Sequence, residues 1–250
     1  MKSIKNFQFA VIVLALSTLA CQAVSGGGNV PEPPSADVPD VEVPTVEAPT
    51  VEIPTVEVPY ASGSDILFSD DFSYDQWGTG TDSDSAVEYV NEALNFIVFT
   101  ENYFVWSTPD AEDYQDVHME VTVINNDTDS TTAFGLMCDK SVSADFYYVA
   151  VTPAGQYAIA KAVTGETDVF LTNNDEWADS DLITQNADSY RVGMDCGNGR
   201  LTLYVDGVEI ASVNDSSYTS GQVAVMAWSG EDVGLTTNVS FDDFVMTELP

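Results

Sequence analysis

Residues 189–213 read SYRVGMDCGNGRLTLYVDGVEIASV, and this stretch decides the fold. Apolar residues alternate with polar or small ones over residues 190–194 and again over residues 201–205, which is the period of a half-buried β-strand. Gly197-Asn198-Gly199 makes one tight turn, and Asp206-Gly207 supplies the two positive-φ residues of a type I′ hairpin. The stretch therefore predicts three consecutive antiparallel strands. Because such a meander buries only one face, a second sheet must cover it.

This meander, followed by SGQVAVMAW (residues 220–228) and VSFDDFVM (residues 239–246), resembles the concanavalin A-like lectin and glucanase superfamily, in particular its LamG-like and laminarinase-like members. The resemblance covers about Asp65 to Leu249. It implies an all-β, two-sheet antiparallel jelly-roll sandwich, and it supplies the expected strand order. Its motifs are turns and core positions, so it speaks for the fold and not for the function.

The rest of the domain, which we place at residues 64–250, has the same character. Short alternating segments are separated by Gly, Asn, Asp and Ser, and no long helical periodicity occurs. The expected strands are 65–69, 87–90, 94–99, 103–107, 117–125, 131–138, 146–152, 157–162, 167–171, 189–196, 201–205, 208–213, 221–227 and 239–246.

Residues 1–21 have the layout of a secretory signal peptide: two lysines, an apolar run over residues 7–16, and small residues before Cys21. The apolar run is too short to span a bilayer. The string STLAC resembles a bacterial lipoprotein processing site, which implies that the Cys21 thiol is lipidated and anchors an exported protein at the cell surface or envelope. Thr18 and Leu19 depart from the family's pattern, so ordinary signal cleavage nearby is the alternative.

Residues 22–63 form a linker built on a Pro-Thr-Val-Glu repeat that runs from Pro39 to Pro59. Proline excludes helix, and the short apolar pieces between prolines cannot build a core. In polyproline II geometry, at about 3.1 Å per residue, residues 31–59 are a stalk that reaches roughly 90 Å. The alternative is a tail that has no spacing role.

The chain is strongly acidic, with 41 Asp and Glu against 6 Lys and Arg and a net charge of −35. Such a surface repels nucleic acid and anionic lipid headgroups, so the expected membrane contact is through the lipid anchor only. Among glycans it favours neutral chains over anionic ones. The general interpretation is that the acidic surface keeps a secreted or salt-adapted protein soluble. The alternative is that particular carboxylates bind cations.

Two cysteines, Cys138 and Cys196, remain if Cys21 carries lipid. In an exported protein this pair predicts a disulfide, with two buried free thiols as the alternative. Each cysteine comes late in an alternating strand, so we expect neighbouring strands to bring them together.

The residues that an enzyme would need are scarce. Glucanases of the superfamily carry a Glu-x-Asp-x-x-Glu or Glu-x-Asp-x-Glu strand, and neither string occurs here. The single histidine, His118, lies in the alternating strand DVHMEVTV and is interpreted as an ordinary strand residue. A sugar-modifying enzyme, similar to LamG-like keto-sugar hydrolases, is the minority hypothesis.

Acidic pairs stand at both ends of the domain. In similar jelly rolls the first and last strands meet, and an aspartate of the last strand helps to hold a structural calcium ion. The resemblance places that role on Asp242, with Asp70 from the first strand as its partner. The alternative is that both aspartates simply end strands.

Tryptophan rings stack on sugars while nearby amides and carboxylates bind the hydroxyls. Trp228 is the leading candidate, because it leaves its strand beside Asp232, and Trp106 and Trp177 follow. Trp77 is interpreted as a core anchor near the start of the domain. The hypothesis that follows is a non-catalytic, stalk-mounted glycan-binding module; a structural or adhesion domain that binds another protein is the alternative.

Overall fold

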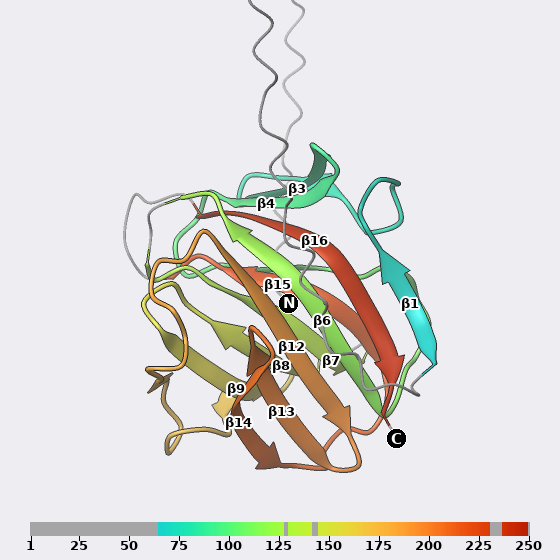
Figure 1. Ribbon diagram of the computed structural model, residues 1–250, viewed down its shortest axis with the longest axis vertical. Helices are drawn as coiled ribbons and strands as arrows, with labels where there is room; N and C mark the ends of the chain where they lie inside the picture. Colours follow the sequence, from blue (N-terminus) through green and yellow to red (C-terminus); the bar gives the residue numbers. More distant parts are fainter. Residues whose placement is uncertain (1–64, 128–129, 142–144, 231–236, 250) are drawn as a thin grey trace, which may run out of the picture. The chain divides into compact units, whose positions relative to one another are not determined.

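The computed structural model describes residues 65–127, 130–141, 145–230 and 237–249 (Figure 1). These residues lie in one compact unit, Thr55–Pro250, and form sixteen β-strands. In this part of the chain there is no helix long and apolar enough to cross a membrane. The predicted signal peptide, Cys21 and the repeat linker lie outside the described residues. The strands are β1 (Ile66–Asp70), β2 (Gly80–Thr81), β3 (Ser85–Val90), β4 (Ala93–Val98), β5 (Phe104–Ser107), β6 (Val117–Asn125), β7 (Ala133–Lys140), β8 (Phe146–Val151), β9 (Gln156–Ala162), β10 (Val169–Phe170), β11 (Ala178–Asp179), β12 (Ser189–Gly197), β13 (Arg200–Val205), β14 (Val208–Asn214), β15 (Gln222–Trp228) and β16 (Thr237–Glu248).

The strands form two antiparallel sheets that are stacked face to face. The nine-stranded sheet has the order β14-β13-β12-β6-β16-β4-β3-β2, and β1 pairs with β16. The seven-stranded sheet has the order β10-β9-β8-β7-β15-β5, and β11 pairs with β9. Figure 1 shows β13, β12, β6 and β16 side by side in front, with β7 and β8 behind them. The predicted two-sheet jelly-roll sandwich is confirmed.

The meander that decides the fold is present as predicted, in the order β12, β13 and β14. Asn198 and Gly199 have φ values of 54° and 71° in the first turn, and Asp206 and Gly207 have values of 51° and 75° in the second. Both turns therefore have the positive-φ pair of a type I′ hairpin, whose twist matches that of the flanking strands.

The core lies between the two sheets and follows the period of two. In β6 the odd-numbered residues from Val117 to Val123 are buried, and the residues between them are partly exposed. Trp77 is 4% exposed and contacts Phe72 and Phe244 with ring centroids 5.3 Å and 5.0 Å away, which confirms it as a core anchor. Its indole N–H donates to Asp70 Oδ2 at 2.9 Å, so the polar end of the buried ring is satisfied.

Cys138 and Cys196 form the predicted disulfide, with Cα atoms 6.5 Å apart. The expectation that neighbouring strands bring them together was wrong: Cys138 belongs to β7 of one sheet and Cys196 to β12 of the other. Both side chains point into the core from opposite sides, so the bond ties the two sheets to each other. Closing a loop of 58 residues stabilises the fold by about 4 kcal/mol in the chain-entropy description.

Two strands were missed, β2 and β11. Each has two residues, which is too short to show any alternation, and each exists only because a neighbouring strand supplies its hydrogen-bonding partner.

Candidate functional site

The outer face of the seven-stranded sheet carries a second apolar layer. In β7, Phe134 and Leu136 point into the core between the sheets, whereas Ala133 and Met137 point to the opposite side. The buried members of this outer layer are Ala133, Met137, Phe146, Tyr148, Ala150, Ala160, Ala162, Ala224 and Met226, and Phe104, Phe170, Trp177 and Trp228 pack against them. We call the seven rings of this side the aromatic face: Phe104, Trp106, Phe146, Tyr148, Phe170, Trp177 and Trp228.

The rings of the aromatic face touch in two groups. In the first, Phe104 lies 6.0 Å from Trp106 and 5.8 Å from Phe146 between centroids. In the second, Trp177 and Trp228 stack with centroids 6.3 Å apart and planes at 26°. Phe104 and Trp228 are paired across β5 and β15, so the two groups are contiguous. The rings therefore form one continuous cluster. Trp106 is exposed, Phe146 and Tyr148 are buried, and the other four rings are partly buried.

Small residues under the rings make this arrangement possible. Ala150 and Ala160 are fully buried beneath the rings although they lie on the outer side of their sheet. Gly135 occupies the same side of β7, and a Cβ atom there would overlap the carbonyl oxygen of Val149. The backbone of β7 thus approaches β8 more closely than any other residue would allow.

Polar groups hold the tryptophans in place. The Trp228 indole N–H donates to Asn102 Oδ1 at 3.1 Å, and the Asn173 amide donates to the Trp177 carbonyl at 2.6 Å. Trp106 is 40% exposed, and Lys140 Nζ lies 5.8 Å from its ring centroid, a cation–π distance. A ligand on this face would therefore meet preorganised rings with polar groups at their margins.

One carboxylate accepts a hydrogen bond from a residue of the aromatic face. The Tyr148 hydroxyl donates to Asp168 Oδ2 at 3.0 Å. Burial raises the pKa of Asp168, and burial together with the Asp168 charge raises the pKa of Tyr148. The hydroxyl therefore stays protonated and serves as a fixed donor to Asp168.

The three tryptophans chosen from the sequence, Trp106, Trp177 and Trp228, all lie on this one face. Asp232 lies outside the described residues. Sequence reasoning missed the other four rings. The signal was present in NYFVWS (residues 102–107) and DFYYVA (residues 145–150), where rings recur at alternate positions of strands that also feed the core.

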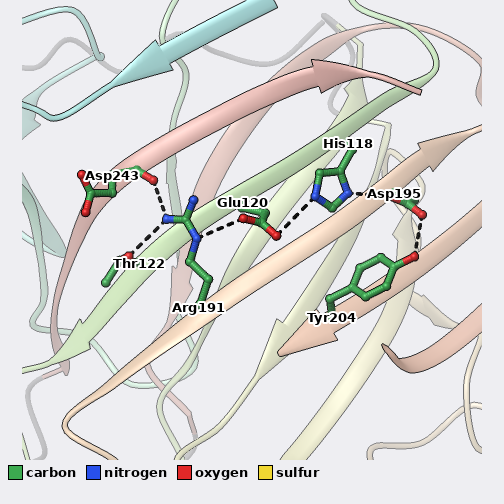
Figure 2. Close-up of polar contacts among 7 residues, drawn as sticks. All are labelled: His118, Glu120, Thr122, Arg191, Asp195, Tyr204 and Asp243. Atoms are coloured by element: carbon green, nitrogen blue, oxygen red, sulfur yellow. Dashed lines mark hydrogen bonds and ion pairs between the residues drawn. The ribbon is translucent and has the colours of Figure 1, made fainter. Parts of the chain in front are cut away.

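A second group of polar residues lies on the outer face of the nine-stranded sheet, where Figure 2 shows it extending across β6, β12, β13 and β16. His118 Nδ1 lies 2.6 Å from Asp195 Oδ1, and its Nε2 lies 3.4 Å from Glu120 Oε1. Burial would lower the pKa of His118, but the hydrogen bonds to these two carboxylates and their charges raise it to about 9. The imidazole is therefore charged at neutral pH and donates from both nitrogens.

The rest of this network is equally well paired. The Glu120 carboxylate also accepts a hydrogen bond from Arg191 Nε at 3.2 Å, and Arg191 Nη1 donates to Thr122 at 3.1 Å. The Tyr204 hydroxyl donates to Asp195 at 2.8 Å. Among the described residues no serine hydroxyl hydrogen-bonds to His118. A charged histidine with both nitrogens occupied has no lone pair for a general base, so the network stabilises the sheet.

The strand junction predicted from the sequence exists, because β1 pairs with β16 and Asp70 lies opposite Phe244. Asp70 is 7% exposed, and its two oxygens accept the Phe72 amide and the Trp77 indole N–H, each at 2.9 Å. This carboxylate fits a structural role better than that of a metal ligand. Asp242 accepts the Asp243 amide at 2.8 Å with one oxygen. Calcium at Asp242 stays a prediction.

No protein-family model and no curated protein matches this chain. Solved structures do match it. A carbohydrate binding module from Bacillus subtilis has a TM-score of 0.53 at 17% identity, over 69% of this chain and 96% of its own. A Bacillus subtilis protein of unknown function with a galectin-like fold has a TM-score of 0.55 at 10% identity, and the match covers 73% of this chain and 96% of that protein. The Bacillus licheniformis β-glucanase has a TM-score of 0.51 at 12% identity, and the match covers 76% of this chain and 100% of the glucanase. These likenesses show that the domain has the concanavalin A-like fold.

Proposed function

We propose that the domain binds carbohydrate at the aromatic face and does not modify it. The observation that carries the proposal is the gathering of Trp106, Trp177 and Trp228 with four further rings on one side of one sheet. Ring faces cover the apolar faces of pyranose sugars, and the cluster presents the exposed Trp106 together with the partly exposed Trp177 and Trp228. Among the solved structures of this fold, one is a carbohydrate binding module, which supports the same proposal.

The residues of this side of the sheet support a non-catalytic role. Glycosidases of either stereochemistry place two carboxyl groups across the scissile bond. In the described part of the chain, neither the seven rings of the aromatic face nor the buried residues of the outer layer carry a carboxyl group. Asp168 lies outside the strands, and its carboxylate already accepts a hydrogen bond from the Tyr148 hydroxyl.

The expected ligand is a neutral polysaccharide. A net charge of −35 opposes sulfated or uronic chains within a screening length of about 8 Å. We expect weak binding, because an open ring surface buries little area and leaves sugar hydroxyls partly solvated.

A pull-down of the full chain on insoluble neutral polysaccharides tests the proposal. Trp106→Ala should lower retention roughly tenfold, since it removes an exposed stacking ring. Tyr74→Ala is the matched control, because Tyr74 is 76% exposed and lies in the loop after β1, away from the aromatic face. If no glycan retains the protein and a specific protein partner is recovered from envelope extracts instead, the adhesion alternative replaces this one.

We also propose that the protein is exported and lipid-anchored through Cys21, on the strength of the signal layout of residues 1–21. Cys21→Ser should release the protein from membranes. A variant that stays as firmly bound as the parent would show that the anchor lies elsewhere.

A further inference from the structure

A polar cavity of about 260 Å³ opens near the disulfide, and its lining includes Asp116, Asp139, Tyr147, Asn198 and Asp215. Asp139 lies in β7 directly after Cys138, where the pairing with β15 shifts register. Its φ of 51° departs from the strand conformation. The bulge therefore sets the Asp139 side chain apart from the regular alternation of β7.

Among the described residues, Asp139 is a buried carboxylate without a partner. It is 7% exposed, and within the described residues no hydrogen-bond donor or cation contacts its oxygens. The neighbouring Asp215, by contrast, accepts from Lys161 Nζ at 2.8 Å and from the Ser217 amide at 2.8 Å. Buried polar groups are nearly always paired, so an exception of this kind calls for a ligand.

The cations nearest this cavity are already engaged. Arg200 lines the cavity, but its guanidinium donates to Ser212 and lies 3.6 Å from Glu209. Lys161 is held by Asp215. Among the described residues, no positively charged side chain is therefore paired with Asp139.

A second carboxylate lies close to the first. Asp116 Oδ1 accepts the Asn198 amide at 2.7 Å in the turn that follows β12, and the Asp116 charge acts on Asp139. Burial and this neighbouring charge raise the pKa of Asp139 to about 6, which is the direction expected for a carboxylate that lacks a counter-charge. Two carboxylates in one cavity without a counter-charge are the donor set that a divalent cation neutralises.

We propose that Asp116 and Asp139 bind a calcium ion in this cavity. Calcium prefers carboxylate and carbonyl oxygens and accepts water in its remaining positions. The volume of about 260 Å³ has room for the ion and several waters, each of which needs about 30 Å³. With two anionic ligands, the affinity should fall in the 10⁻⁴–10⁻³ M class of extracellular calcium modules.

The sulfur atoms beside Asp139 do not take part. Cys138, Asp139 and Cys196 are the one group of three candidate ligand residues that lie within 4.8 Å of one another in the described ranges. Both sulfurs are bonded in the disulfide, so neither is a thiolate. The site therefore uses oxygen ligands only, a donor set that favours calcium over zinc.

Thermal unfolding of the full chain, at constant ionic strength and with calcium or magnesium added, tests the proposal. At a hundred times Kd, calcium should raise the Tm by roughly 5–10 °C, and above Kd the rise should keep growing with the logarithm of the calcium concentration. Magnesium at equal concentration should not reproduce it, because it loses its waters reluctantly. Asp139→Asn and Asp116→Asn should each abolish the calcium-dependent rise while remaining folded, since Asn keeps the side-chain shape.

Two control variants separate this site from general screening of an acidic surface. Asp188→Asn removes one exposed charge elsewhere, and it should keep the full rise. Asp242→Asn should keep it as well. The proposal is overturned if the parent shows no rise with calcium beyond that with magnesium, or if Asp139→Asn keeps the rise. Retention in Asp139→Asn together with loss in Asp242→Asn would place the calcium at the strand junction instead.

Discussion

Replacing His118 with Gln removes the positive charge that holds Glu120 and Asp195 together across β6 and β12. The contacts are 3.4 Å and 2.6 Å long, and the His118 side chain is 30% exposed. A rise of the pKa from 6.5 to about 9 would correspond to roughly 3 kcal/mol at 1.36 kcal/mol per unit. Solvent screening at a partly exposed site reduces this, so we expect about 1–2 kcal/mol.

The sign of the pH dependence follows from the direction of the shift. Because the folded-state pKa is raised, the folded state binds the proton more tightly than the unfolded state. The stabilisation is fully present below pH 6.5 and is lost as the pH rises through about 9. His118→Gln should therefore lower the free energy of unfolding at pH 6, and the difference from the parent should shrink by pH 10.

Urea denaturation of both proteins at the two pH values measures this difference. Because His118 is the only histidine, its pKa can also be read directly from its NMR signals. Arg200→Gln is the control, since the Arg200–Glu209 pair is 3.6 Å long and its side chains are 57% and 52% exposed, and it should change little. A His118 pKa near 6.5, or a difference that is the same at pH 6 and pH 10, would refute the reasoning.

Three further variants test the fold. Cys138→Ala with Cys196→Ala should cost about 4 kcal/mol of unfolding free energy, and an unchanged urea midpoint would contradict an inter-sheet bridge. Gly135→Ala should cost about 1–3 kcal/mol, because the new methyl group overlaps the Val149 carbonyl; a neutral result would show that β7 and β8 are farther apart. Asp70→Ala should cost about 2 kcal/mol in the presence of chelator, whereas a loss seen only with added calcium would make Asp70 a metal ligand.

The sequence predicts most of the strands because the period of two is local. Residues 189–213 carry both the alternation and the turn residues, so β12, β13 and β14 follow directly. The identity of neighbouring strands is not local. Cys138 and Cys196 show this, because each sits at a core position of its own strand, and nothing in either strand says that the two belong to opposite sheets.

The same distinction holds for the site. Trp106 and Trp228 could be chosen from the sequence as large rings at strand ends, but their convergence depends on the pairing of β5 with β15. Asp139 could not be found at all. Its burial arises from a bulge in β7, and its proximity to Asp116 arises from the way the turn after β12 meets the start of β6.

The most direct test of carbohydrate binding at the aromatic face is calorimetric titration of the full chain with a soluble neutral oligosaccharide selected on a glycan array. The account predicts a Kd in the micromolar to millimolar range and a weakening of roughly tenfold in Trp106→Ala, with Tyr74→Ala unchanged. Binding that is equally tight in Trp106→Ala, or no binding to any neutral glycan, would contradict it.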